Sequence, residues 1–114
     1  MKKPNITPGP WRIKDHEIED FRVFGNCEGG ALARVIKANN FGGTAQDQAN
    51  ARLIAAAPAM AEALEAALVG LESDILYCER HPDSHRTTHE GMLAHKRKRL
   101  NDAKAALTLA GYEF

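Results

Sequence analysis

The sequence has 114 residues, 44% of them hydrophobic and 26% charged, and its 15 basic side chains balance its 15 acidic ones. This length suits one domain, and the composition excludes disordered, collagen-like and disulfide-stapled chains. Two distant cysteines and a polar opening stretch predict a protein of the reducing cytoplasm without a secretory signal. We expect a single α+β domain over 1–114, made of a β-meander (1–43), a short helix (44–57) and a helical hairpin (58–114).

The first segment is predicted to form a small three-stranded antiparallel sheet. Apolar and polar residues alternate over 11–14, 21–24 and 33–37, which is the period of a half-buried strand. Glycine and asparagine in the connections favour tight turns. The alternation gives the sheet one apolar face, made of Trp11, Ile13, Phe21, Val23, Ala33 and Val35.

The chain is predicted to be helical after a glycine-rich breaker at 39–43. Thr44 is a good N-cap residue, and an acidic side chain at Asp47 is favourable near the positive end of a helix. We expect Pro58 to end this short helix and to open the next one. The residues expected to lie on the sheet recur at helical spacing and are Ala45, Ala49, Leu53 and Ala56.

The last segment is predicted to be a long antiparallel hairpin. A loop at 81–84 separates two helices, and Gly111 ends the second. Residues 44–80 have a net charge of −4, whereas 81–114 have +2. Folding back therefore predicts ion pairs between the basic run 96–99 and the acidic residues of 65–72. The apolar stripes of the two helices are Leu64, Leu68, Leu71, Ile75 and Cys78, and Leu93, Leu100, Ala103, Leu107 and Ala110.

Apolar residues also occupy other faces of the first hairpin helix. Exposed apolar surface of this extent usually indicates a partner, and a symmetric copy of the same chain is the most common one. We therefore expect a homodimer or a higher homo-oligomer. The residues concerned are Met60, Ala63, Ala67, Val69 and Leu76. The apolar stretch 53–71 contains Glu62, Glu65 and Pro58, which argues against a membrane span.

One group of side chains has the types that bind zinc. Cys78, His81, His85 and His89 are spaced by three, four and four residues, and zinc accepts such nitrogen and sulfur ligands. The alternative, which we favour, is a polar corner between two helices, so that no metal or other cofactor is expected. The sequence contains no complete catalytic motif, and we expect a protein that is not an enzyme.

A site for a small anionic or nucleotide-like ligand is a second possibility. Gly43 and Thr44 open a helix, whose free N–H groups attract anions. Asn50 and Arg52 follow on the same helix, and the guanidinium could bind a phosphate or a carboxylate in bidentate fashion. Trp11 could stack on a base. The alternative is an ordinary capped helix and a core tryptophan.

The basic run Lys96, Arg97, Lys98 and Arg99 could contact phosphates. No aromatic residue is interleaved with it, and four consecutive helical residues point in four directions. A solvated helix face with acidic neighbours is the preferred interpretation, so nucleic acid is not an expected partner.

Two stretches of the sequence are distinctive: Thr-Pro-Gly-Pro-Trp at 7–11 and Asn-Ala-Arg-Leu-Ile-Ala-Ala-Ala-Pro at 50–58. Together they resemble a group of small proteins encoded by tailed phages and prophages. The resemblance implies a phage accessory protein that acts in the host cytoplasm. We expect it to work by binding, as a counter-defence protein that sequesters a nucleotide-like signal or blocks a host protein. The alternative is a nucleic-acid-binding regulator that uses the basic run.

Overall fold

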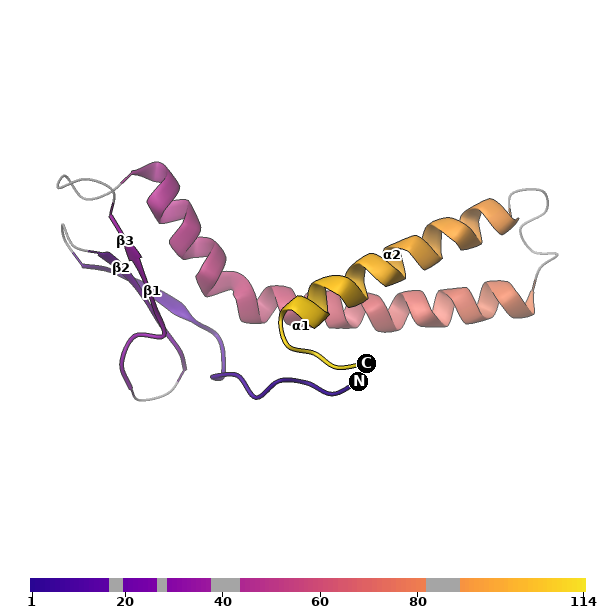
Figure 1. Cartoon of the computed structure of the whole chain (residues 1–114), viewed down its shortest axis with the longest axis horizontal. Coiled ribbons are helices and arrows are strands. Elements are labelled where there is room, and N and C mark those ends of the chain that lie inside the picture. The colour runs from indigo at the N-terminus through magenta and orange to yellow at the C-terminus, as the bar shows by residue number, and fades with distance from the viewer. Residues whose placement is uncertain (17–19, 27–28, 38–43, 82–88) are drawn as a thin grey trace. The chain divides into compact units, whose positions relative to one another are not determined.

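The computed structural model describes residues 1–16, 20–26, 29–37, 44–81 and 89–114, without the side chains of His16 and His89. Three strands precede two helices (Figure 1): β1 (Arg12–His16), β2 (Asp20–Phe24), β3 (Ala33–Ile36), α1 (Ala45–Arg80) and α2 (His89–Leu109). The predicted α+β class is confirmed. The chain forms two compact units, which are the sheet unit (Asn5–Met60) and the hairpin unit (Met1–Pro4 with Ala61–Phe114).

The sheet is antiparallel with the order β1-β2-β3. Ile13 pairs with Val23, which pairs with Ala33 on its other side, and Phe21 pairs with Val35. Because directly paired residues lie on the same face of a sheet, these five side chains form one apolar face. Phe21 and Val23 are buried and the other three half-buried. The predicted apolar face is therefore confirmed for five of its six residues, whereas Trp11 lies just before β1 and is half-buried.

The beginning of α1 is fixed by its N-terminal cap. The Asp47 N–H donates to Thr44 Oγ1 over 3.1 Å, and the Thr44 N–H donates to Asp47 Oδ2 over 3.0 Å. This reciprocal pair satisfies N–H groups that have no partner within the helix. Thr44 is therefore the N-cap, as predicted.

The face of α1 that is buried in the sheet unit differs from the prediction. Ala51 and Pro58 are buried, whereas Ala45, Ala49 and Leu53 are exposed and only Ala56 of the predicted residues is half-buried. The alanine-rich sequence offers an apolar residue on nearly every side of the helix. Helical spacing alone therefore could not identify the side that is buried.

The predicted helix end at Pro58 is also wrong, because α1 continues through this residue to Arg80. Proline has no N–H to donate and usually breaks a helix interior. Here its ring is buried, and it lies so close to Gly9 that a Cβ on this glycine would be 3.1 Å from Pro58 Cβ. This packing offsets part of the cost of the missing hydrogen bond.

The hairpin unit is held together by apolar residues that recur every three or four positions along α1. We call Ala61, Leu64, Leu68, Leu71, Ile75 and Cys78 the inner seam. One cluster joins it to α2 through Leu68, Ala103, Leu107 and Tyr112, and a second through Ile75, Cys78 and Leu93. Both predicted stripes are thus confirmed, except that Ala110 is exposed.

The end of α2 closes on the N-terminus of the chain. Gly111 has a φ of 94°, a conformation that favours glycine and lets the Tyr112 N–H reach the Leu107 carbonyl over 3.0 Å. The next residue, Glu113, exchanges two backbone hydrogen bonds with Lys2, of 2.7 and 2.9 Å. The two ends of the chain therefore lie together, as Figure 1 shows.

Ion pairs link α2 to α1, but not in the predicted register. Lys96 lies 3.5 Å from Asp74, Arg97 lies 2.7 Å from Glu79, and Lys104 lies 3.8 Å from Glu72. The basic run therefore lies closer to the end of α1 than the predicted 65–72. The reason is that apolar packing sets the register: Leu93 of α2 is buried against Ile75 and Cys78 near the end of α1.

Candidate functional site

The predicted anion site contains side chains that already have structural roles or point into solvent. Trp11 is half-buried, and its Nε1 donates to the Thr7 carbonyl over 3.0 Å. Thr44 is used in the helix cap, and Asn50 and Arg52 are exposed. No hydrogen bond or ion pair joins these four residues in the described part of the chain, and Gly43 lies outside it. The ligand site stays a prediction.

The predicted zinc ligands are described only in part. Cys78 is buried, with Lys96 Nζ 3.8 Å from its sulfur. His81 is exposed and stacks on Tyr77, with 4.3 Å between the ring centroids. His85 and the side chain of His89 lie outside the described residues. Within those that are described, no three ligand side chains gather around a possible metal position.

The basic run of α2 is largely engaged with carboxylates. Lys96 and Arg97 pair with α1 as described above, and Lys98 pairs with Asp102 over 2.9 Å on its own helix. Arg99 is exposed. The charge that the run offers to a phosphate is therefore smaller than its sequence indicates, because three of its four cations have acidic neighbours.

A second row of residues follows α1 on roughly the side opposite the inner seam. We call Glu62, Ala66, Val69, Ser73, Leu76 and Arg80 the outer seam; all six are exposed. They are spaced by four and three residues in alternation, which is the spacing of a coiled-coil contact. Sequence analysis identified Val69 and Leu76 as surplus apolar residues but not the regular row to which they belong.

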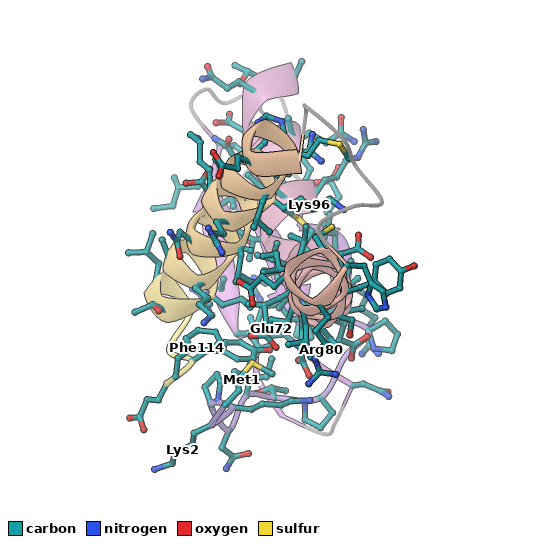
Figure 2. All side chains as sticks on the ribbon, turned by 90° about the vertical axis from the view of Figure 1, so that its right-hand side faces the viewer. Met1, Lys2, Glu72, Arg80, Lys96 and Phe114 are labelled. Carbon is teal, nitrogen blue, oxygen red and sulfur yellow. The ribbon has the colours of Figure 1, made fainter. Side chains whose placement is uncertain are left out.

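The outer seam has opposite charges at its two ends. Glu62 and Arg80 are about five helical turns apart and so face the same side of α1. Neither forms an ion pair with any residue that the structure describes. Figure 2 shows Arg80 and Lys96 on opposite sides of α1. Arg80 therefore lies away from the ion pairs of the hairpin and is accessible to another molecule.

The polar face of the sheet contains a cluster of cations that sequence analysis missed. Lys14 pairs with Arg22, which pairs with Arg34 on the next strand. These three residues therefore lie side by side across the sheet, and Arg12 lies on the same face, opposite Phe24. These basic residues occupy the polar positions of the strand alternation, but their proximity becomes apparent only when the strands are paired in register.

The helix α1 is the one described helix that is long and apolar enough to cross a membrane, by length and composition alone. Few of its most apolar residues are buried in the chain. The same property is expected of a helix that buries apolar surface in another protein molecule.

Comparison with known proteins identifies the family of the chain. A family model described as Salmonella phage P22 protein Y8K6 matches residues 1–112, which includes the sheet and both helices. No curated protein and no solved structure matches the chain significantly. The match supports the resemblance to phage-encoded proteins and extends it to the hairpin. The chain therefore belongs to the family of Salmonella phage P22 protein Y8K6.

Proposed function

We propose that this phage accessory protein is not an enzyme and acts by binding, in the host cytoplasm, as a homodimer formed along the outer seam of α1. The observation that carries the proposal is the exposed row with coiled-coil spacing on the side of α1 away from α2. Exposed apolar side chains are unfavourable in water, so a regular row of them indicates that another surface covers it.

A second copy suits this row because the row is complementary to itself. In an antiparallel arrangement about a two-fold axis near residue 71, Glu62 lies opposite Arg80 of the partner subunit, and the reverse contact follows by symmetry. Leu76 then lies opposite the small Ala66, and Val69 opposite Ser73. Large side chains thus meet small ones, and each acid meets a base.

A charge exchange tests this arrangement directly. Glu62→Arg brings like charges together at both ends of the dimer, and exposed pairs contribute about 0.2–1 kcal/mol each. We expect dimer affinity to fall about tenfold in this variant and also in Arg80→Glu. The double variant Glu62→Arg/Arg80→Glu should restore the affinity of the original protein, because it exchanges the two charges without changing the register.

Sedimentation equilibrium over a range of concentrations gives the dissociation constants. Equal losses in the two single variants without recovery in the double variant contradict the antiparallel register. A protein that is monomeric throughout contradicts the dimer itself. If the protein pellets with membranes after a salt wash, lipid and not a second copy covers α1, and the cytoplasmic location is wrong.

The biological role we propose is counter-defence, in which the dimer sequesters a nucleotide-like signal or blocks a host protein. Membership of a phage protein family supports a role during infection, and the absence of a complete catalytic motif from the sequence favours binding. A phage that lacks the gene should form fewer plaques on a host that carries the relevant defence system. It should form normal numbers on a host from which that system has been deleted.

The two versions of this role require different ligands. Calorimetry against a panel of linear and cyclic nucleotides tests sequestration, with Arg52→Ala as the variant and Arg99→Ala, at another exposed arginine, as its control. Nucleotide binding that depends on Arg52 supports the sequestration of a nucleotide-like signal. If no nucleotide binds, the version that remains is the blocking of a host protein.

A further inference from the structure

We propose that the polar face of the sheet binds single-stranded nucleic acid. The residues concerned are Arg12, Lys14, Arg22 and Arg34, together with Phe24, and we call them the basic face. This inference goes beyond the proposed function and does not depend on the dimer, because the basic face belongs to the sheet unit alone.

The cations of the basic face are close neighbours on adjacent strands. Lys14, Arg22 and Arg34 are direct cross-strand neighbours, and like charges in such positions destabilise a sheet. The central cation, Arg22, is half-buried and already engaged, with Asp20 among its partners at 2.9 Å, and Asp20 also lies 3.9 Å from Arg34. Lys14 and Arg12 are both exposed. The exposed cations Arg12, Lys14 and Arg34 therefore attract an anionic ligand to this face.

The shape of the basic face favours an extended ligand. Three paired strands place the outer cations, Lys14 and Arg34, about 10 Å apart, and both are exposed. A small molecule usually requires a concave site, whereas a single strand can lie across a sheet and place several phosphates along it. The row is therefore long enough to contact more than one phosphate of the same strand.

An aromatic side chain on the same face favours a single strand over a duplex. Phe24 is half-buried, and the Arg12 guanidinium lies 5.7 Å from the centre of its ring. Rings and guanidinium planes on a sheet are surfaces on which unpaired bases stack. The bases of a duplex are already stacked on each other and cannot use them.

Fluorescence anisotropy with a labelled thymidine oligonucleotide tests the proposal. Three exposed cations, each neutralising one phosphate, give a salt slope of about −2, so binding should weaken roughly 20-fold between 50 and 200 mM salt. The variant Lys14→Glu should bind at least tenfold more weakly, whereas Lys14→Arg should bind like the original protein. The matched control Arg99→Glu makes the same charge change on α2 and should have no effect.

Thermal unfolding of the same variant separates binding from folding. Lys14→Glu places an opposite charge beside Arg22, so we expect its melting temperature to be equal or higher while its affinity falls. Three results overturn the proposal. They are no binding of the oligonucleotide at 50 mM salt, tighter binding of the duplex than of the single strand, and loss of binding in Arg99→Glu but not in Lys14→Glu.

Discussion

The most informative perturbation is the removal of the two largest apolar side chains of the outer seam. Val69 is 53% exposed and Leu76 is 47% exposed. Complete burial of such a side chain contributes about 1.5–3 kcal/mol, so covering the exposed half contributes about 1 kcal/mol. Two residues in each of two subunits give about 4 kcal/mol, which corresponds to nearly a thousandfold in the dissociation constant. Val69→Ser/Leu76→Ser should weaken the dimer by this factor.

The assay is light scattering coupled to size exclusion at several loading concentrations, with circular dichroism to confirm that the variant is folded. The control is Leu109→Ser on α2, because Leu109 is 92% exposed and does not belong to the outer seam. If exposed apolar surface caused unspecific association, this control would have the larger effect. If the double variant forms a dimer at the same concentrations as the original protein, the assignment of the interface is refuted.

Three further predictions concern folding. Leu107→Ala should lower the free energy of unfolding by about 2–5 kcal/mol in urea titrations, since Leu107 is fully buried between the two helices; a change below 1 kcal/mol would contradict this packing. Thr44→Ala should cost about 1 kcal/mol in the same assay, because it removes the acceptor of the cap, and Thr44→Ser should restore most of it. A hydrogen bond to the Glu65 carboxylate raises the pKa of Lys3 above its ordinary value of 10.5. Protonated Lys3 therefore stabilises the fold up to about pH 10 and loses this effect above it, so the stabilities of the original protein and Lys3→Met should converge as the pH rises beyond 10.5.

The sheet could be predicted from the sequence because one of its faces is apolar and the other is mostly polar. This contrast makes Phe21 and Val23 alternate with polar neighbours, and the alternation fixes both the strands and their apolar side. The N-cap was also predictable, since Thr44 and Asp47 interact within one helical turn. Features of this kind depend on neighbours in the sequence and need no knowledge of distant contacts.

The errors concern contacts between distant residues. The helix continues through Pro58 because its buried ring packs near Gly9, a residue that helix rules for local sequence do not consider. The partners of Lys96 and Arg97 were misplaced because the register of the hairpin follows apolar contacts such as that of Leu93 with Ile75, which the charge pattern does not reveal. The cation row across the sheet was missed for the same reason, because Lys14, Arg22 and Arg34 become neighbours only when three strands pair.

The two seams of α1 explain why this helix has apolar residues on more than one side. The inner seam has large side chains such as Leu68 and Ile75, which fill the space against α2. The outer seam alternates small and medium side chains and has an acid at one end and a base at the other. If α1 packed only against α2, polar residues in place of Val69 and Leu76 would make the protein more soluble. The apolar side chains at these positions lower the solubility of the monomer, and contact with a second copy would remove them from water.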